Sequence, residues 1–335
     1  MKKLSLLLVL MAFAIVTAAC GGNSGSGNGA GSTASPSPTA SSEASPSPAA
    51  SAAPAELTIT DRFGDHKIKT NPEKVVVFDF GTLDTLDKLG VEVTGVPSSN
   101  LPGYLSKYED EKYVNVGGLM EPDFEKIAEI QPDLIIISGR QADSYEEFNK
   151  IAPTIYMGVD TEKYMESFKA NVTTLGQIFG KEAEAEKELA AVEASIKELN
   201  EKVTAAGNNA LVVLTTSGKV SAFGTGSRFG IIHDVFGFTP VDPSVKVTTH
   251  GNQVSFEYIA EKNPDYLFVV DRDAVVSSDK AAQPAAQVIE NDLVKNTNAY
   301  KNGRIVYLNP DYWYLSGGGL VSVSEMVNEV SAGLK

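Results

Sequence analysis

The chain has 335 residues and a formal net charge of −15, from 28 basic and 43 acidic side chains. An acidic chain of this kind argues against nucleic acid as a partner and makes any basic cleft conspicuous. Its one cysteine excludes a disulfide within the chain. The length exceeds what one small core needs and fits two lobes of ordinary domain size.

The chain begins with an export signal. Lys2 and Lys3 precede an apolar run too short to span a membrane comfortably, and small residues lead to Cys20. We interpret residues 1–19 as a signal peptide, whose removal takes the charge from −15 to −17. Cys20 is then the lipidated first residue of a bacterial lipoprotein, held on a membrane by its acyl chains. Thr17 replaces the larger aliphatic residue usual at that position, so an ordinary signal peptide is the alternative.

A tether and a first lobe follow the cysteine. Residues 20–56 are almost entirely Gly, Ser, Ala, Pro, Asn and Thr, which predicts a flexible segment with nothing to bury. Residues 57–180 are predicted to form an α/β lobe. An apolar strand at 74–78, a turn at Gly81 and a helix succeed one another there, as in a parallel sheet covered by helices.

A long helix is predicted over residues 181–206. The segment is rich in Ala, Glu, Lys and Leu, and it has one apolar stripe formed by Leu189, Val192, Ile196, Leu199 and Val203. A coiled coil is the alternative, but a stripe of this length needs no partner chain. A rigid helix between two lobes limits how far they can separate, so we expect a cleft that is nearly preformed.

Residues 207–335 are predicted to form a second α/β lobe of similar architecture. Its apolar strands are LVVLTTSG, with SAFG as a continuation, then YLFVVD and RIVYL, and a short helix begins within SRFGIIHDVFGF. The fold class is therefore α/β, with two Rossmann-like lobes and a cleft between them.

One segment occurs twice. Residues 124–140 and 256–272 are identical at 8 of 17 positions, and each copy contains a helix, a buried strand and a terminal arginine. Side chains at the carboxyl ends of parallel strands face the crevice where ligands bind. We therefore expect Arg140 and Arg272 to point into one cleft between the lobes.

Arg228 is the third arginine expected in this cleft. It lies in the glycine-rich stretch FGTGSRFG, so three of the five arginines converge while the 23 lysines are spread over the surface. Arginine offers a flat fork of donors to oxyanions and tolerates desolvation, so this pattern indicates an anionic ligand. The alternative is that each arginine pairs with a local carboxylate such as Asp143 or Asp271.

His250 and an aromatic cluster are further candidates. His250 lies in a polar loop before a helix, where it is either a structural group or a ligand to metal. Tyr312, Trp313 and Tyr314 follow a strand and precede a glycine-rich turn. Aromatic rings there can stack on a ligand, and a phenolate can meet Fe(III), but core packing is the alternative. On extended chain either the two tyrosines or the tryptophan face the ligand.

The chain resembles the class III substrate-binding proteins of ABC importers, and in particular the Gram-positive lipoproteins that capture ferric siderophores of the petrobactin type. The resemblance covers nearly all of the chain after the tether and rests on the order and spacing of KVVVFDFGTLDTLDKLG, EPDFEKIAEIQPDLIIISGRQAD, IAPTIYMGVDT, SRFGIIHDVFG, THGNQVSFEYI, NPDYLFVVDR and WYLSGGGL.

The resemblance implies a function and a site. It implies two Rossmann-like lobes joined by one long helix, and an anionic ferric siderophore, bound as a ligand and not as a cofactor, on the triad Arg140, Arg228 and Arg272. It implies that His250 and either Tyr312 or Tyr314 complete the iron shell where a chelate leaves sites vacant. Ferric petrobactin saturates its own iron, so these residues would then only contact the ligand.

The resemblance also implies partners and a location. Glu125 and Glu257 match the exposed glutamates through which each lobe of such a protein binds the paired permease subunits. Both fall in the first turn of a helix, where an acidic side chain also gains from the helix dipole, which is the alternative role. A monomer on the extracellular face of the cytoplasmic membrane is expected.

Other functions are less consistent with the residues. Haem, cobalamin or another iron chelate is the alternative ligand, although a triad of arginines favours a small, multiply anionic complex. A zinc or manganese receptor needs several His and carboxylate ligands, whereas this chain has three His, one of them His66 beside the tether. A surface enzyme acting on a chelate is disfavoured because the GxSxG, HExxH and Walker motifs are all absent from the sequence.

Overall fold

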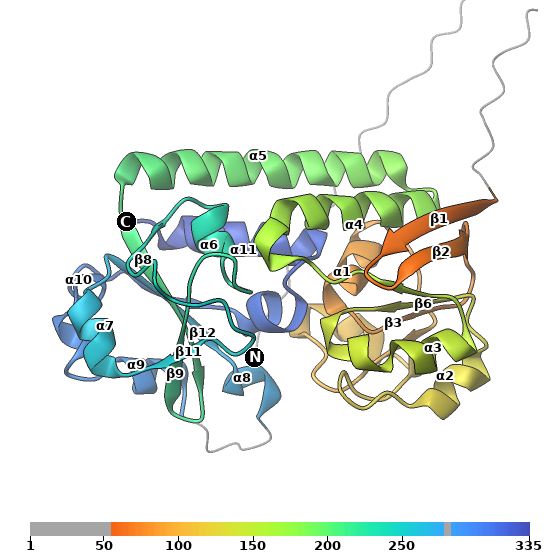
Figure 1. The fold of residues 1–335 in the computed structure, drawn as a ribbon, viewed down its shortest axis with the longest axis horizontal. Helices are drawn as coiled ribbons and strands as arrows, with labels where there is room; N and C mark the ends of the chain where they lie inside the picture. Colours follow the sequence, from red (N-terminus) through yellow and green to blue (C-terminus); the bar gives the residue numbers. More distant parts are fainter. Residues whose placement is uncertain (1–54, 278–282) are drawn as a thin grey trace, which may run out of the picture. The chain divides into compact units, whose positions relative to one another are not determined.

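The computed structural model describes residues 55–277 and 283–335 (Figure 1). The predicted signal peptide, Cys20 and nearly all of the predicted tether lie outside these residues. The contacts divide the chain into two units, and everything described below belongs to the unit Ala52–Lys335. In this part of the chain, no helix combines the length and the apolar character that crossing a membrane requires.

The first lobe contains a parallel sheet with strand order β5-β4-β3-β6-β7. Every residue of its central strands β3 and β6 is buried, as expected for a parallel sheet with helices on both faces. The strands are β3 (Val75–Val77), β4 (Gly95–Val96), β5 (Val114–Asn115), β6 (Leu134–Ile137) and β7 (Thr154–Tyr156). The helices are α1 (Phe80–Lys88), η1 (Gly103–Glu109), α2 (Phe124–Ile130), η2 (Gly139–Ser144), α3 (Tyr145–Ile151), η3 (Thr161–Lys163) and α4 (Tyr164–Phe179).

An antiparallel hairpin precedes this sheet and was not predicted. Strand β1 (Glu56–Asp61) pairs with β2 (Gly64–Lys69) through a turn at Gly64, whose φ is 121°. The side chains of β1 alternate between exposed and partly buried, which is the period of a strand with one covered face. That alternation is present in LTITD, so the sequence does contain a signal for the hairpin.

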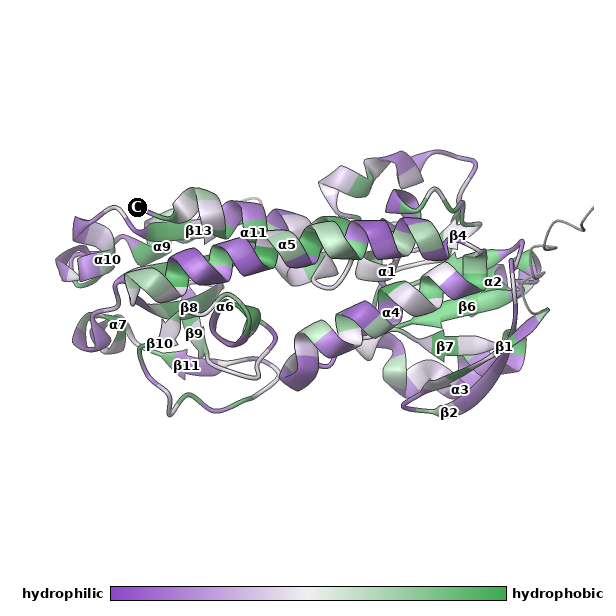
Figure 2. Ribbon diagram, turned by 90° about the horizontal axis from the view of Figure 1, so that it is seen from above, coloured by the Kyte–Doolittle hydropathy of each residue, from purple (hydrophilic) through white to green (hydrophobic). Residues whose placement is uncertain are grey.

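The long helix α5 (Glu182–Ala206) packs on α4 of the first lobe and on α11 (Leu320–Gly333) of the second. Figures 1 and 2 show it running along both lobes. The five residues of its apolar stripe are all buried. They belong to one hydrophobic cluster that also contains Phe168 of α4 and Met326 of α11. The two lobes therefore share a core along this helix.

The sheet of the second lobe is mixed. Its main path is β11-β9-β8-β12-β13, in which β8, β12 and β13 are parallel while β9 is antiparallel to both its neighbours. The prediction that SAFG continues the preceding strand was wrong, because Ser217 and Gly218 at φ 49° and 73° turn the chain back. The strands are β8 (Asn209–Thr216), β9 (Lys219–Phe223), β10 (Thr239–Pro240), β11 (Asn252–Val254), β12 (Tyr266–Asp271) and β13 (Ile305–Leu308).

The duplicated segment folds the same way in both lobes. Asp123 caps α2 and Ser255 caps α7, each by accepting the backbone N–H three residues on. Both helices end on a left-handed residue, Gln131 and Asn263, and a buried strand follows each. The other helices of this lobe are α6 (Ile231–Asp234), α7 (Phe256–Lys262), α8 (Asp273–Val276), α9 (Ala285–Ile289), η4 (Val294–Asn296), α10 (Asn298–Lys301) and η5 (Asp311–Ser316).

The first and second lobes also meet at two glycines. Gly81 does not form the turn expected from the sequence but lies in the first turn of α1. A Cβ on Gly81 would come within 3.0 Å of the Ser316 carbonyl oxygen, and one on Gly319 would overlap the carboxylate of Asp84 and the carbonyl of Gly81. The backbones of α1 and of the turn before α11 approach this closely because neither glycine has a side chain.

Replacing Gly319 with alanine tests this contact. We expect Gly319→Ala to lower the free energy of unfolding by about 1–3 kcal/mol, because the methyl group has no space between the two backbones. Gly118→Ala is the control, since no atom lies closer than 3.4 Å to a Cβ built there. Urea unfolding of the three proteins measures the difference. Equal stability of the two variants would show that the lobes do not touch at this point.

Candidate functional site

The three predicted arginines come from both lobes. Arg140 lies in η2 directly after β6, and Arg272 lies between β12 and α8, so both follow the carboxyl end of a parallel strand. Arg228 lies in the loop between β9 and α6. Because β9 is antiparallel to β8, Arg228 does not follow the carboxyl end of a parallel strand as the other two arginines do.

All three arginines contact Tyr314. Arg140 Nη2 and Arg228 Nη2 donate to its carbonyl oxygen at 2.7 and 2.9 Å, and Arg272 Nε donates to its hydroxyl at 2.9 Å. The guanidinium carbons of Arg140, Arg228 and Arg272 lie 5.9, 4.4 and 5.7 Å from the centroid of the ring. The structure therefore brings the three predicted side chains together around one residue.

Two further acceptors of the cluster were missed by sequence reasoning. Arg140 Nη1 donates to the Leu315 carbonyl at 3.2 Å, and Arg272 Nη1 donates to Thr216 Oγ1 at 3.2 Å. Thr216 ends β8, the parallel neighbour of β12, so its position at the carboxyl end of a strand could have indicated that it lies near Arg272. A backbone carbonyl carries no signal of this kind, since every residue has one.

The cluster holds more positive than negative charge. In residues 55–277 and 283–335, the only ion pair of these arginines joins Arg272 Nη1 to Asp273 at 4.0 Å. Neither Asp143 nor Asp271 pairs with them. All three side chains are partly buried. Burial and the neighbouring charge of Arg140 lower the pKa of Arg228 to about 10, so its charge costs more here than in water, although the side chain stays charged near neutral pH.

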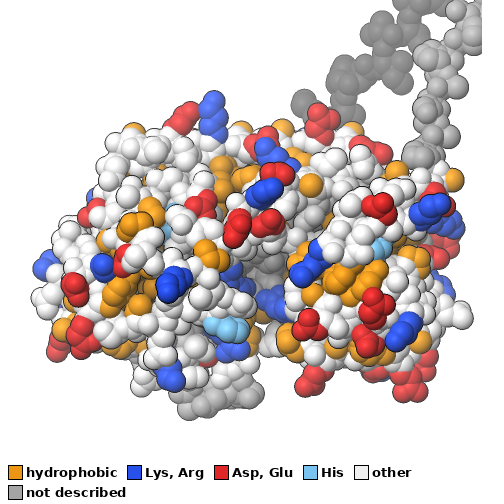
Figure 3. All heavy atoms as spheres, viewed as in Figure 1, with side chains coloured by type: hydrophobic (Ala, Val, Ile, Leu, Met, Phe, Trp, Pro, Cys, Tyr) orange, Lys and Arg blue, Asp and Glu red, His pale blue; other side chains and the backbone are white. Residues whose placement is uncertain are grey.

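Figure 3 shows how charged side chains are distributed on one face of the molecule. Basic side chains appear inside the hollow at the middle of this face, whereas acidic and basic side chains are mixed on the surfaces around it. The hollow is therefore electropositive within a chain that is acidic as a whole.

The aromatic cluster is helical and not extended. Residues Asp311–Ser316 form a single π-helical turn, so the alternation expected for extended chain does not apply. Trp313 is 2% exposed, and its indole N–H donates to Glu329 at 2.8 Å. A buried indole is not available to a ligand, which corrects the place of Trp313 among the contact residues. Tyr312 and Tyr314 are both partly exposed.

His250 is not part of the arginine cluster. Its side chain is exposed on the loop before β11, and within the described residues it makes no hydrogen bond or ion pair. The following Gly251, at φ 73°, places the backbone beneath the ring of Phe223. Across the described ranges, no group of three or more His, Cys, Asp or Glu side chains could hold a metal ion.

Glu125 and Glu257 occupy equivalent places in the two lobes. Each lies in the first turn of its helix, α2 or α7, with an exposed side chain. The chain as described shows no ion pair for either carboxylate. Hydrogen bonds from the backbone and from Ser255 lower the pKa of Glu257.

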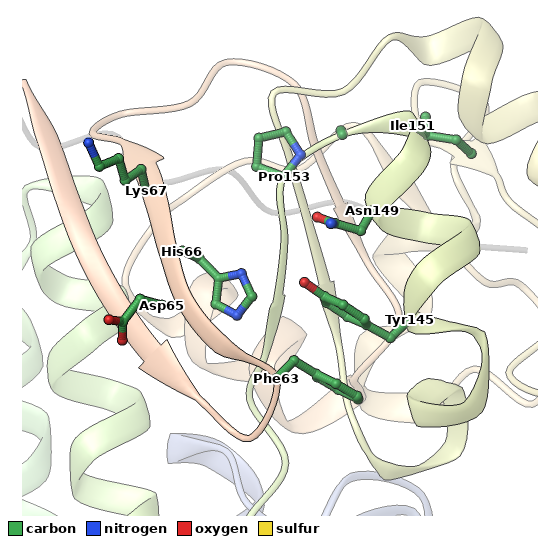
Figure 4. A pocket seen from close by; sticks show the side chains of 9 residues that line it. Phe63, Asp65, His66, Lys67, Tyr145, Asn149, Ile151 and Pro153 are labelled. Atoms are coloured by element: carbon green, nitrogen blue, oxygen red, sulfur yellow. The ribbon is translucent and has the colours of Figure 1, made fainter.

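A recess of about 530 Å³ lies elsewhere on the first lobe, between the β1–β2 hairpin and α3 (Figure 4). His66, which lines the recess, is held within the protein, since its Nε2 contacts Asp61 at 2.9 Å and Asp61 accepts the N–H of Tyr156. Phe63 stacks on Tyr145 with ring centroids 4.0 Å apart. These contacts attach the hairpin to the lobe, and none of the three arginines lines the recess.

The fold and this site define a substrate-binding protein. Residues 75–312 match the model of the periplasmic binding protein family, and the chain belongs to that family. Its members are binding proteins and not enzymes. The predicted family and the predicted α/β fold class of two lobes joined by a long helix are therefore confirmed.

Several members of this family that bind iron chelates are similar to this chain. Petrobactin-binding protein YclQ of Bacillus subtilis is 55% identical over 80% of this chain and 84% of its own. The crystal structure of YclQ gives a TM-score of 0.81 at 53% identity, covering 84% of this chain and 99% of that one. The catecholate-siderophore-binding protein VctP of Vibrio cholerae gives 0.79 at 39%, covering 83% and 99%. Ferric-anguibactin-binding protein FatB of Vibrio anguillarum is 30% identical over 83% and 87%.

The repulsion within the cluster predicts a gain in stability when one charge is removed. We expect Arg228→Met to raise the free energy of unfolding of the ligand-free protein by about 1 kcal/mol, because a desolvated charge is replaced by an apolar chain of similar length. The unfolding temperature should rise by about 2–4 °C, as differential scanning calorimetry would measure.

Arg62→Met is the matched control for this gain. Arg62 is exposed and lies 5.4 Å from the Phe63 ring and 5.2 Å from the Tyr156 ring, away from the other arginines. Its replacement loses these contacts and relieves no repulsion. If Arg228→Met were less stable than the unmodified protein, repulsion among the three arginines would not destabilise the ligand-free protein.

Proposed function

We propose that this protein is a cell-surface lipoprotein that binds a ferric siderophore, petrobactin or a related catecholate chelate, and delivers it to an ABC permease for iron uptake. The observation that carries the proposal is the meeting of Arg140, Arg228 and Arg272 around Tyr314 with almost no countercharge. Such a site is complete only when an anion supplies the missing charge.

A ferric catecholate has the chemistry that this cluster recognises. It carries several negative charges on a compact, aromatic surface. Three guanidinium groups can donate charge-assisted hydrogen bonds to its oxygens, and the rings of Tyr312 and Tyr314 can stack on its catechols. Contacts of this kind can reach nanomolar affinity, about 12 kcal/mol of binding free energy. A larger and less charged ligand such as haem or cobalamin would leave part of the positive charge unpaired.

The relatives support this ligand class. YclQ is named for petrobactin, VctP for catecholate siderophores and FatB for ferric anguibactin. Among these ligands we favour petrobactin, because YclQ is 55% identical to this chain whereas FatB is 30% identical. His250 and the tyrosines Tyr312 and Tyr314 are proposed to contact the chelate, and to meet iron only where the chelate leaves a coordination site open.

The remaining assignments concern the ends and divisions of the chain. Residues 1–19 are proposed to be removed as a signal peptide, Cys20 to carry the lipid anchor, and residues 20–56 to tether the protein to the extracellular face of the membrane. The ligand-binding part then consists of lobes 57–180 and 207–335 joined by the helix 181–206.

Arg228→Met tests the ligand. We expect this variant to bind ferric petrobactin at least about 30-fold more weakly, because losing one partner of a buried charge pair costs about 2–5 kcal/mol. Quenching of Trp313, the only tryptophan of the chain, reports the titration. Arg62→Met should bind like the unmodified protein. Since Arg228→Met is expected to be more stable, unfolding cannot explain its loss, and unchanged titration curves would remove Arg228 from the site.

A second experiment separates binding from turnover. The purified protein is mixed with ferric petrobactin, iron-free petrobactin, a ferric hydroxamate and haem, and each mixture is examined by native mass spectrometry. An intact ferric catecholate complex is the expected species. Preference for haem or a hydroxamate would overturn the ligand class, and appearance of a cleaved ligand would indicate an enzyme.

Glu125 and Glu257 are proposed to bind the two permease subunits. We expect the double variant Glu125→Lys/Glu257→Lys to keep its affinity for the siderophore but to lose most iron uptake in cells, because reversed charges repel the basic partner surface. The control is Glu129→Lys/Glu261→Lys, which makes the same charge change on exposed residues of the same two helices. Equal uptake by the two double variants would refute the docking role.

A further inference from the structure

The junction between the lobes contains a buried carboxylate that belongs to neither the arginine cluster nor the surface. Asp84 of α1 is 0% exposed. Its Oδ1 accepts the backbone N–H of Val321 at 3.2 Å, and its Oδ2 accepts that of Ser322 at 3.0 Å. These N–H groups lie in the first turn of α11, where a helix has no internal acceptor for them. A residue of the first lobe thus caps the last helix of the second.

Tyr104 extends this contact to η5. Its hydroxyl donates to Asp84 Oδ2 at 3.0 Å and lies 2.7 Å from Ser316 Oγ, from which it can accept. The Tyr104 ring lies 4.8 Å from the ring of Tyr312. At the other end of η5, the N–H of Gly103 donates to Asp311 at 2.9 Å. The first and last residues of the π-helical turn are therefore both held by the first lobe.

The segment that is held in this way carries the centre of the ligand site. Tyr314 lies midway along η5, and its carbonyl is the common acceptor of Arg140 and Arg228. Leu315 is part of the hydrophobic core of the first lobe. A shift of η5 relative to α1 would therefore move the phenol ring and release both guanidinium groups from their shared oxygen.

We propose that Asp84 and Tyr104 are positioning residues for ligand binding, which fix η5 across the lobe junction so that Tyr314 holds Arg140 and Arg228 in place. The proposal rests on the proposed function, because its effect is read as siderophore affinity. Neither Asp84 nor Tyr104 is bonded to an arginine of the cluster, so their influence passes through η5.

The electrostatics of Asp84 supply an independent readout. Burial raises its pKa to about 7, although the Ser322 and Tyr104 hydrogen bonds oppose the rise. Burial and the negative charge of Asp84 raise the pKa of four tyrosines around it, Tyr104 and Tyr108 of η1, Tyr164 of α4 and Tyr312 of η5. Glu325 and Glu329 of α11 raise the pKa of Tyr312 as well. Because the pKa of Asp84 in the folded state lies above the unfolded value of 3.8, its contribution to stability is fully present below that value and is lost as the pH rises toward 7.

The first test uses a matched pair of tyrosines. Tyr104→Phe removes only the hydroxyl that joins Asp84 to Ser316. Tyr108→Phe is the control, since it removes a hydroxyl from the same helix that has no hydrogen-bond partner among the described residues. Titration with ferric petrobactin should show about 10-fold weaker binding for Tyr104→Phe and unchanged binding for Tyr108→Phe. Equal affinity of the two variants would overturn the proposal.

A ligand-free measurement separates this inference from the proposed function. Amide hydrogen exchange of the peptide 311–322 should be about 10-fold faster in Tyr104→Phe than in Tyr108→Phe, because η5 has lost a tie to the first lobe. If the unmodified protein binds no ferric chelate but exchange responds in this way, the function is wrong and the positioning contact stands. If exchange is equal in the two variants, the contact itself is refuted.

Asp84→Asn tests the carboxylate itself through the pH dependence of stability, which does not depend on the Tyr104 hydroxyl. The ratio of unfolding constants for the unmodified protein and this variant should change progressively between pH 4 and 7. The other titrating groups are present in both proteins, so the change reports the proton of Asp84. A ratio that is constant with pH would show that Asp84 does not titrate at the junction. Should Asp84→Asn fail to fold, the tyrosine pair still decides the proposal.

Discussion

The arrangement of the arginine cluster depends on one backbone oxygen that two guanidinium groups share. The carbonyl of Tyr314 accepts hydrogen bonds from Arg140 of the first lobe and Arg228 of the second, while the Tyr314 hydroxyl accepts from Arg272. A neutral carbonyl can orient guanidinium groups but cannot neutralise them. The repulsion among the three like charges is therefore offset by the stability of the rest of the fold. A negatively charged ligand would neutralise it.

The fold can meet this cost because the lobes are joined at more than one place. The core along α5 contains residues of both lobes, and the capping of α11 by Asp84 adds a polar contact between the lobes. The glycines Gly81 and Gly319 allow the backbones to approach closely enough for that capping. These contacts restrict how the lobes can move. The arginines are therefore already oriented before the proposed ligand binds, and less conformational freedom is lost on binding.

The sequence predicted the repeated helix, strand and arginine because each depends on local rules: a cap, an apolar period and the end of a parallel strand. Those rules locate Arg140 and Arg272. They do not locate Arg228, since whether β9 continues β8 or returns beside it depends on a two-residue turn at Ser217 and Gly218. The π-helical turn at Asp311–Ser316 and the capping by Asp84 depend on contacts between residues more than 200 apart in the chain, and no local pattern reports these.

The carboxylates near the cluster make their hydrogen bonds elsewhere. Asp271 accepts the backbone N–H groups of Ala274 and Ala285, and Asp79 accepts the N–H and hydroxyl of Thr82. Asp273, which approaches Arg272 at 4.0 Å, accepts the hydroxyl of Thr216. Each carboxylate is thus engaged at a helix start or a strand end. An acid that was free to turn toward the arginines would pair with them. Because these acids are held by backbone N–H and hydroxyl groups, the guanidinium groups of the cluster stay available to the proposed ligand.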